Sequence, residues 1–258
     1  MRGTPAQRLR GIGAIVTGAA SGIGAATAEA FDREGATTLL VDVDERPLRA
    51  LAARLGDRAT ACVADLGSDD AVETVVARAG TVLPAIDVLV NNAGISSKTL
   101  FVDVTEDEWH RVLGVNAFAA ARLAAACADE MAARRSGCIL NVSSISGLGG
   151  GPPQSVYGIS KGALLGLTRE LAAALAPHGV RVNAVLPGVI DTPMVRRDVA
   201  AGGDPDGTDL ARWIAGAVPL GRIGEPAEVA EVLAFLASPE AAAVTGAFVP
   251  VEGGFLSA

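Results

Sequence analysis

Short apolar runs recur along the chain, and a stretch typical of a helix follows each of them. The runs are rich in Val, Ile, Leu and Ala. Continuous apolar strands that alternate with helices indicate a parallel sheet covered on both faces, with right-handed crossovers. We predict strands at residues 12–18, 36–42, 59–65, 86–92, 137–144, 180–188 and 246–254.

Proline, glycine and a capping pattern mark the ends of three predicted helices. Thr105 begins the sequence TEDE, in which Glu108 is the third following residue, as in a capping box. Pro177 and Gly179 end the helix that follows the fifth strand, and Pro226 opens a later helix at its first turn.

The helix that begins at Thr105 is predicted to run to about residue 135, which is long for a globular protein. Its middle, AFAAARLAAACA, is small and apolar on several faces. Such a helix is suited to pack on the sheet with one face and on a second subunit with another.

Residues 191–224 do not fit the alternation of strands and helices. They mix charged residues with Gly and Pro, and they include Trp213, which looks exposed. A long insertion between the sixth strand and the last long helix is typical of a mobile substrate-binding lid. The alternative is a poorly ordered surface excursion without a role.

Length and composition limit the possible architectures and partners of the chain. The chain has 258 residues, half of them apolar, and α/β folds of this size are often single, so we predict one domain over residues 1–258. The net charge is −8 and no basic tract occurs, which argues against nucleic acid and anionic membranes as partners. No apolar run reaches the length of a membrane span without Gly, Pro or a charge.

Cysteine usage and the first residues indicate the cytoplasm. Cys62, Cys127 and Cys138 lie far apart, no CxxC pair occurs, and both histidines are distant from every cysteine. We therefore predict no metal site and no disulfide framework, and a packing role for each cysteine. The stretch MRGTPAQRLRG has no apolar core, so it is not expected to be a signal peptide.

The first predicted strand leads into a glycine-rich turn, TGAASGIG, and then into a helix. Gly18 permits the tight turn, while Gly22 and Gly24 allow close approach of the helix and of a ligand. The free N–H groups and the positive dipole at the helix N-terminus suit a pyrophosphate. This pattern predicts a dinucleotide site.

An acidic residue ends the second strand at the place where a nucleotide ribose would lie. Asp42 can accept hydrogen bonds from the ribose hydroxyls, and it would repel a 2′-phosphate. Arg46 is the only nearby cation, so we predict NAD in preference to NADP. Asp65 and Leu66, after the third strand, suit a contact with the adenine edge, although Asp65 could instead cap the next helix.

The only tyrosine of the chain lies in the stretch YGISK, with Lys161 four residues after Tyr157. On a helix these two side chains share one face. A nearby ammonium favours the phenolate and lowers the pKa of the phenol. Taken alone, the pair is either a proton-transfer device or an ordinary surface contact.

The motifs, taken in order, resemble those of the classical short-chain dehydrogenase/reductase family. They are TGAASGIG, NNAG at residues 91–94, Asn116, Ser144, YGISK and PGVIDT at residues 187–192. The resemblance runs from the first strand to the terminal VEGG. It implies a Rossmann-type, doubly wound, seven-stranded parallel sheet of order 3-2-1-4-5-6-7, with helices on both faces in one domain.

The resemblance also implies catalytic roles. Tyr157 is the general acid/base, Lys161 lowers its pKa and binds the nicotinamide ribose, and Ser144 holds the substrate oxygen. Ser143 and Ser146 lack the family spacing to the tyrosine. Asn116 is expected to bend its helix and to hold a water in a proton relay. Together with the patterns above, the resemblance places cofactor contacts at Tyr157 and Lys161 and at Gly18, Ser21, Gly22, Ile23, Gly24, Asp42, Val43, Asp65, Leu66, Asn92, Ala93, Gly94, Pro187, Gly188, Ile190 and Thr192.

The walls of the substrate site are predicted at residues 96–98, 145–153, 189 and 194–213, and Lys98 could meet an anionic substrate. We expect a small-molecule secondary alcohol or its ketone. The alternatives are an NADPH-dependent 3-oxoacyl-thioester reductase and, from another class, a catalytically silent nucleotide-binding scaffold. The resemblance and the alanine-rich helix imply a homotetramer. His110 and Trp109 are interpreted as a surface residue and a packing residue.

Overall fold

The computed structural model describes residues 7–150, 155–204 and 206–257. Its strands form one seven-stranded sheet in the order β3-β2-β1-β4-β5-β6-β7, and all neighbouring strands are parallel. The predicted topology is confirmed, and each strand lies within its predicted range. The strands are β1 Gly13–Thr17, β2 Thr37–Asp42, β3 Ala59–Val63, β4 Val88–Asn91, β5 Gly137–Val142, β6 Val180–Pro187 and β7 Phe248–Val251.

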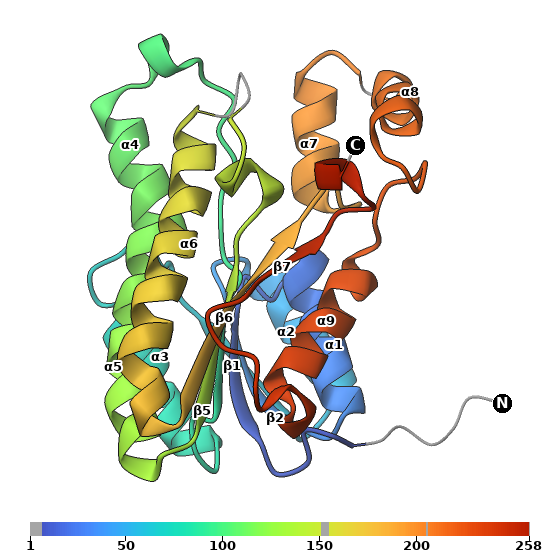
Figure 1. Cartoon of the computed structure of the whole chain (residues 1–258). Coiled ribbons are helices and arrows are strands. Elements are labelled where there is room, and N and C mark those ends of the chain that lie inside the picture. Colours follow the sequence, from blue (N-terminus) through green and yellow to red (C-terminus); the bar gives the residue numbers. More distant parts are fainter. Residues whose placement is uncertain (1–6, 151–154, 205, 258) are drawn as a thin grey trace, which may run out of the picture.

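Helices cover both faces of the sheet (Figure 1). One layer holds α1, α2 and α9, and the other holds α3, α5 and α6. The helices are α1 Gly22–Arg33, α2 Glu45–Leu55, α3 Ala71–Val82, α4 Glu106–Leu113, α5 Ala119–Arg134, α6 Ser155–Leu175, α7 Pro193–Ala201, α8 Thr208–Ala217 and α9 Pro226–Ala237, with the π-helical turn η2 Gly114–Phe118 and the short 3₁₀ turns η1 Phe101–Asp103, η3 Ile145–Gly147, η4 Ala176–His178, η5 Pro239–Ala241 and η6 Phe255–Ser257.

Successive residues of each central strand pack into two different hydrophobic cores, one on each face of the sheet. In β1, Ala14 and Val16 pack into the first core, towards α1 and α9, while Ile15 packs into the second core, towards α3 and α5. In β2, Leu40 joins the first core and Leu39 the second. All five side chains are fully buried. Because strand side chains alternate between faces, a strand buried on both faces has to be apolar throughout, which explains the continuous apolar runs.

The predicted long helix exists, but it is not regular. It consists of α4, the π-helical turn η2 and α5. The Thr105 side chain accepts a hydrogen bond from the Glu108 N–H at 3.3 Å, as predicted. The capping box was wrong in its second half, because the Glu108 carboxylate accepts from the hydroxyls of Ser97 at 2.7 Å and Thr99 at 2.9 Å. A tertiary partner thus replaces the local one.

Among the described residues, one helical segment is long and apolar enough to cross a membrane. It covers residues 106–134, its most apolar window has a mean hydropathy of 1.3, and half of that window is buried inside the fold. Core helices of globular domains meet the same criteria. This segment packs on the sheet through Leu123, Cys127 and Met131, all of which are fully buried.

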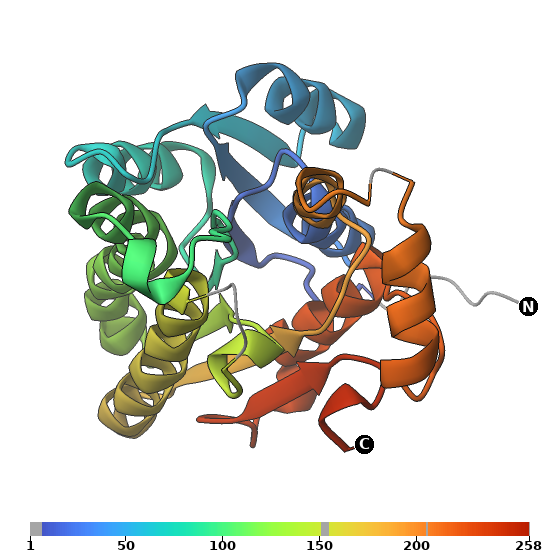
Figure 2. The same ribbon diagram turned by 90° about the horizontal axis from the view of Figure 1, so that it is seen from above.

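The insertion after β6 forms two helices, α7 and α8, which stand above the carboxyl ends of the strands (Figures 1 and 2). Thr192 caps α7 by accepting from the Val195 N–H at 3.3 Å. Trp213, on α8, is 46% exposed and packs on Phe255 with ring centroids 5.7 Å apart. The described part of the insertion is therefore ordered, and its role as a substrate-binding lid stays a prediction.

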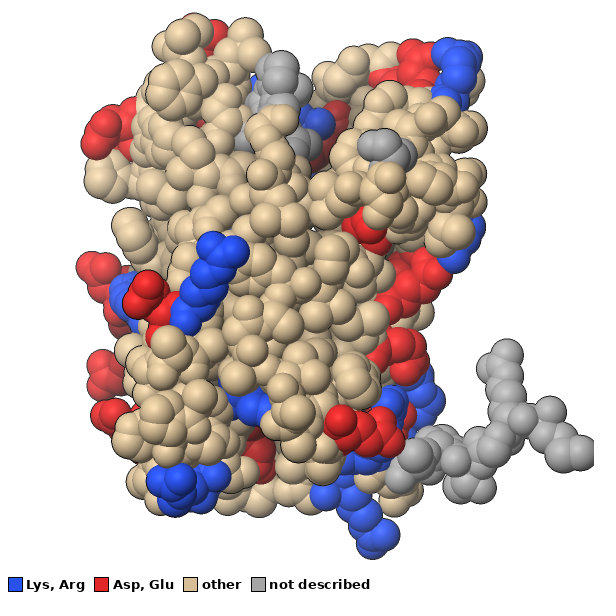
Figure 3. Space-filling view, viewed as in Figure 1, with Lys and Arg blue, Asp and Glu red and all other residues tan. Residues whose placement is uncertain are grey.

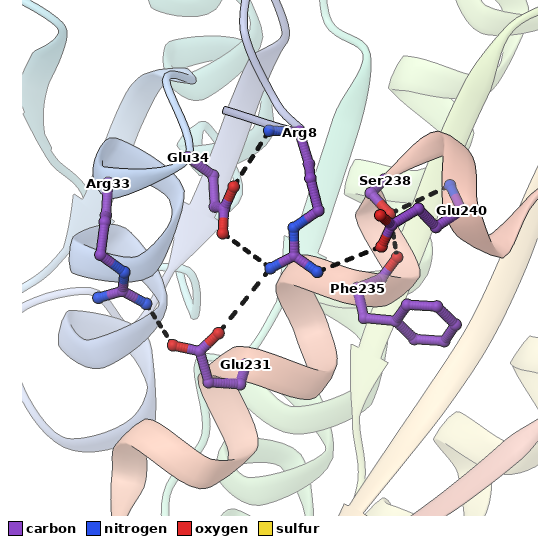
Figure 4. Close-up of polar contacts among 7 residues, drawn as sticks. All are labelled: Arg8, Arg33, Glu34, Glu231, Phe235, Ser238 and Glu240. Carbon is purple, nitrogen blue, oxygen red and sulfur yellow. Dashed lines mark hydrogen bonds and ion pairs between the residues drawn. The ribbon is translucent and has the colours of Figure 1, made fainter. Parts of the chain in front are cut away.

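An ion-pair cluster fastens the segment before β1 to the first core (Figure 4). The Arg8 guanidinium lies 2.8 Å from Glu34, 3.4 Å from Glu240 and 3.9 Å from Glu231, which in turn pairs with Arg33. The Arg8 N–H also donates to Glu34 at 3.0 Å. The hydrogen bond from Arg8 lowers the pKa of the Glu34 carboxyl. These contacts link the N-terminal segment to α1, α9 and η5.

The three cysteines are free and buried, which confirms their packing role. Burial raises the pKa of the Cys127 thiol to about 12 and that of the Cys138 thiol to about 11. Both thiols are therefore protonated and unreactive at neutral pH. Among the described residues, no group of three or more His, Cys, Asp or Glu side chains could hold a metal ion.

Candidate active site

A cavity of about 400 Å³ opens at the carboxyl ends of the strands, beneath α7, at the end of the molecule that Figure 2 views from above. Parallel sheets bind ligands at this edge. Most of the predicted site residues line the cavity: Gly18, Ser21, Gly22, Ile23, Asp42, Val43, Asn92, Ala93, Gly94, Ser144, Tyr157, Lys161, Pro187, Gly188, Ile190 and Thr192. Gly24, Asp65, Leu66 and Asn116 lie outside this lining.

The glycine-rich turn forms a cradle at one end of the cavity. Ser21 precedes α1 in an extended conformation, its side chain makes no capping hydrogen bond, and the first turn of α1 carries no acidic residue. Gly18 has a φ of +65°, and a Cβ at Gly24 would lie 2.0 Å from the Gly18 carbonyl oxygen. The N-terminus of α1 is therefore open to an anion, and the cradle fits the phosphates of a dinucleotide.

Asparagines hold the neighbouring strands in place beside this cradle. The Asn92 amide donates to the carbonyl of Thr17 at 2.8 Å and to that of Gly18 at 3.1 Å. The Asn91 amide donates to the Asn141 side chain, 2.9 Å away on β5. The side chains of the NNAG motif thus tie β4 to β1 and β5. This rigidity fixes the floor of the cavity.

Asp42 lies where the turn meets the end of β2. Its Oδ2 accepts from the Ala20 N–H at 2.9 Å, and its Oδ1 accepts from the Asp44 N–H at 3.0 Å. Asp44 lines the same end of the cavity. Two carboxylates therefore make this end of the cavity acidic.

The two residues expected at the adenine edge have local roles in the structure. The Asp65 carboxylate accepts from the Gly67 N–H at 2.9 Å, which closes a tight turn. Asp65 does not take the alternative N-cap role, because Asp70 occupies the N-cap position of α3. Leu66 is 7% exposed and packs in the second core. Both residues lie outside the lining of the cavity, and their contact with the adenine edge stays a prediction.

The structure brings Ser144, Tyr157 and Lys161 together at the other end of the cavity. Ser144 follows β5, and its side chain lowers the pKa of the Tyr157 phenol by hydrogen bonding. Tyr157 and Lys161 lie one turn apart at the start of α6, and the Lys161 Nζ is 5.7 Å from the Tyr157 ring centroid. The Lys161 Nζ donates to the Val142 carbonyl at 2.9 Å. The three functional groups therefore converge where β5 ends and α6 begins.

Burial has the largest effect on the pKa of both titratable groups. Burial and, to a smaller extent, the charge of Asp198 raise the pKa of Tyr157 to about 12, although the hydrogen bond from Ser144 lowers it. Burial lowers the pKa of Lys161 to about 8. The expected lowering of the Tyr157 pKa by Lys161 is not seen, because burial is the largest influence on both groups.

Asn116 lies in η2 and is a positioning residue. Its Oδ1 accepts from the Ile95 N–H at 2.8 Å, and its Nδ2 donates to the Ile95 carbonyl at 3.0 Å and to the Ser160 Oγ at 2.9 Å. The side chain thus joins the loop after β4 to α6. The π-helical turn is the irregularity expected at this residue, and the water relay stays a prediction.

Other residues considered from the sequence lie apart from the site. His110 is exposed and its Nε2 lies 3.2 Å from Glu106, which confirms a surface role. Trp109 packs edge-on against Phe101, with ring centroids 6.2 Å apart. Lys98 is exposed. Residues 151–153 of the predicted substrate wall lie outside the described residues.

The lid was predicted as a substrate wall over residues 194–213, and three of these residues line the cavity: Met194, Val195 and Arg197. The contact that Asp198 makes was not predicted. Asp198 reaches from α7 to the loop after β4, where its Oδ1 accepts from the Ser96 Oγ at 2.9 Å. No local pattern links these two residues, because they are about a hundred positions apart.

Comparisons with known proteins agree with this architecture. The family model described as Enoyl-(Acyl carrier protein) reductase matches residues 18–256. The 3-oxoacyl-[acyl-carrier-protein] reductase FabG of Thermotoga maritima is 39% identical over 252 residues, covering 96% of this chain and 99% of that protein. The short-chain reductase protein NovJ of Streptomyces niveus is 42% identical over 245 residues, covering 93% of this chain and 92% of that protein.

Two solved structures have the same fold. A short-chain dehydrogenase/reductase family protein has a TM-score of 0.86 and 37% identity, covering 96% of this chain and 99% of that chain. A candidate NAD(P)-dependent gluconate 5-dehydrogenase from Beutenbergia cavernae, with NADP bound at low occupancy, has a TM-score of 0.89 and 35% identity, covering 97% and 98%. The chain therefore belongs to the short-chain dehydrogenase/reductase family of nucleotide-dependent oxidoreductases.

Proposed function

We propose that the protein is an NAD-dependent oxidoreductase that interconverts a secondary alcohol and its ketone. The observation that carries the proposal is the convergence of Ser144, Tyr157 and Lys161 at one end of a cavity whose other end is a phosphate cradle. When bound, the nicotinamide ring accepts a hydride from the carbinol carbon or returns it to the carbonyl. The substrate is a small molecule.

The chain's own residues handle the proton and the oxygen. In oxidation, the Tyr157 phenolate takes the proton of the substrate hydroxyl, and in reduction the phenol gives it to the carbonyl oxygen. The Ser144 Oγ donates to the same oxygen and stabilises its developing charge. Lys161, whose Nζ lies 5.7 Å from the Tyr157 ring centroid, supplies a positive charge beside the phenolate. Asn116 holds α6 against the loop after β4.

The acidic end of the cavity supports NAD. Asp42 and Asp44 both line it, and a 2′-phosphate would have to lie beside two carboxylates. Asp42 is also held in place by two backbone N–H groups, so it cannot easily turn away. We therefore infer that the adenosine ribose carries free hydroxyls.

A second candidate function is an NADPH-dependent 3-oxoacyl-thioester reductase. It is supported by the names of the FabG relatives and by the NADP bound to the structural neighbour. Arg197 lines the cavity from the lid and could meet a phosphate. The third alternative, a silent nucleotide-binding scaffold, is disfavoured because Ser144, Tyr157 and Lys161 are all present.

One experiment separates these functions. The purified protein is assayed by nicotinamide absorbance with NAD⁺ or NADP⁺ on a panel of secondary alcohols, and with NADH or NADPH on an acetoacetyl thioester. We expect turnover of an alcohol with NAD⁺. Preferential reduction of the thioester with NADPH would establish the second candidate instead, and no turnover of any pair would support the scaffold.

Asp42→Asn tests the nucleotide choice with little change of shape. Removing the charge is expected to lower kcat/KM with NAD⁺ and to raise it with NADP⁺, so that their ratio falls by about tenfold or more, equivalent to about 1.4 kcal/mol. The matched control is Asp57→Asn, because Asp57 is exposed and lies outside the cavity lining. A wild-type preference for NADP⁺ would contradict the ribose argument.

We further propose that the protein is a cytoplasmic homotetramer. The outer face of α6 supports a subunit contact, since Ile159, Ala163 and Gly166 are exposed and uncharged. Figure 3 shows few charged side chains over the upper part of this face. Phe118, on the neighbouring helix, is 57% exposed and adds an apolar side chain that a partner subunit would cover.

A further inference from the structure

Asp198 joins two segments that contribute neighbouring residues to the cavity lining. It lies on α7, one turn after the lining residues Met194 and Val195 and on the same helix face, and its Oδ1 accepts from the Ser96 Oγ at 2.9 Å. Ser96 lies two residues after Gly94, where a Cβ would be 3.3 Å from the Lys161 Nζ. The carboxylate is therefore anchored to the loop that lies against the catalytic lysine, far from the acidic nucleotide end.

The charge of Asp198 is felt by the catalytic phenol. It raises the pKa of Tyr157, and among the described residues it is the only carboxylate with a resolved effect of this kind. A charge acts in this way when it is close and poorly screened by solvent. Contact geometry and electrostatics thus place the carboxylate at the same end of the cavity.

The anchor leaves the charge of Asp198 uncompensated. Ser96 is neutral, and within the described part of the chain no Lys, Arg or His lies within ion-pair distance of Asp198. The other lid carboxylates differ. Asp191 pairs with Arg196 and Asp209 with Arg212, while Asp204 and Asp206 accept from backbone N–H groups of the first residues of α8. Among the described lid carboxylates, Asp198 is therefore the one that neither pairs with a cation nor caps a backbone turn.

We propose that Asp198, oriented by Ser96, is a specificity-determining residue that accepts a hydrogen bond from a hydroxyl or ammonium group borne by the substrate near its carbinol carbon. The inference rests on the proposed function and narrows its substrate class to diols, polyols and amino alcohols. A site built around a hydrogen-bond acceptor disfavours analogues that leave the acceptor unpaired, and a carboxylate in the same position is repelled.

A matched substrate series tests this assignment. It comprises a secondary butanol, the corresponding vicinal diol, the vicinal amino alcohol and the corresponding hydroxy acid, assayed with the preferred nucleotide. The wild-type enzyme is expected to prefer the diol or the amino alcohol, and the preferred member tells a hydroxyl from an ammonium ligand. In Asp198→Asn, the ratio of kcat/KM for that substrate to kcat/KM for the butanol should fall by about tenfold.

The pH profile gives a second readout. Because the charge of Asp198 raises the pKa of Tyr157, Asp198→Asn should move the rising limb of the pH–rate profile for alcohol oxidation to lower pH. Lys161 and Arg197 also face the cavity, and both are unchanged in this variant. Asp209→Asn is the matched control on α8, and it should change neither the substrate ratio nor the limb.

Failure of this inference can be distinguished from failure of the proposed function. Turnover with a substrate ratio that Asp198→Asn leaves unchanged, or that Asp209→Asn lowers equally, overturns the inference alone. Absence of nucleotide-linked oxidation of every substrate in the series and of the alcohol panel overturns the proposed function, and the inference with it.

Discussion

At the scale of single residues, the burial of Lys161 makes the stability of the fold depend on pH. Its ammonium is buried and donates to the Val142 carbonyl, and burial lowers its pKa from 10.5 to about 8. The unfolded chain therefore binds the lysine proton more tightly than the folded chain does. Between pH 8 and 10.5, the unfolded state holds more protons, so this group makes stability rise with pH.

Lys161→Met removes this dependence. The melting temperature of the variant minus that of the wild type is expected to decrease from near pH 8 to near pH 10.5, because only the wild type is relieved of a buried charge. Thermal melts followed by circular dichroism measure it. Lys98→Met is the control, since Lys98 is exposed and the variant should follow the wild type. A difference that stays constant with pH would contradict the burial argument.

Site residues that belong to local patterns could be predicted from the sequence, and those that depend on distant partners could not. The glycine-rich turn and the Tyr157–Lys161 pair are each held within a few residues by one turn or one helix. Asp198 meets Ser96 only because α7 folds back over the cavity. Leu66 follows a strand, as predicted, yet its side chain enters the core, a choice that packing makes and spacing does not reveal.

At the scale of elements, the strands were predictable and the long helix was predictable only in extent. Apolar runs that serve two cores carry a strong signal, and every strand lies within its predicted range. Periodicity gives no signal for the π-helical turn η2, and only the family resemblance implied a bend at Asn116, whose side chain is satisfied by Ile95 and Ser160 from other elements. Likewise, the Glu108 carboxylate does not complete the capping box, because it accepts hydrogen bonds from two hydroxyls of the loop after β4.

The ion-pair cluster around Arg8 predicts which surface charge matters to stability. Glu34 is 8% exposed at its side chain and Arg8 20%, so Arg8→Ala leaves a largely buried carboxylate without its main donor. We expect a loss of about 1–2 kcal/mol and a fall in melting temperature of about 2–8 °C. The loss should shrink at acidic pH, because the low pKa of Glu34 stabilises the fold only where the unfolded carboxyl is ionised.

Arg49→Ala is the matched control for this cluster. Arg49 and Glu45 form a helical pair whose side chains are 64% and 60% exposed. Such pairs contribute about 0.5 kcal/mol or less. Equal melting temperatures for the Arg8 and Arg49 variants would show that the cluster does not fasten the N-terminal segment.

At the scale of the whole molecule, the uncharged face of α6 and the exposed Phe118 predict self-association. Light scattering of the purified protein should give the mass of four chains of 25.9 kDa. Phe118→Arg should give a smaller species with an unchanged fold by circular dichroism, because a charge would have to be buried at the contact. A wild-type monomer, stable at assay concentrations, would contradict the proposed tetramer.

Tyr157→Phe tests most directly whether the three converging side chains perform the chemistry. The variant and the wild type are compared for NAD⁺-linked oxidation of the best alcohol in the panel, and NAD⁺ binding is measured by quenching of tryptophan fluorescence. Turnover is expected to fall by about 10²–10⁴-fold while the dissociation constant for NAD⁺ changes little, because the phenol transfers the proton and the glycine cradle binds the phosphates. Turnover of the variant at the wild-type rate would contradict this role of the phenol.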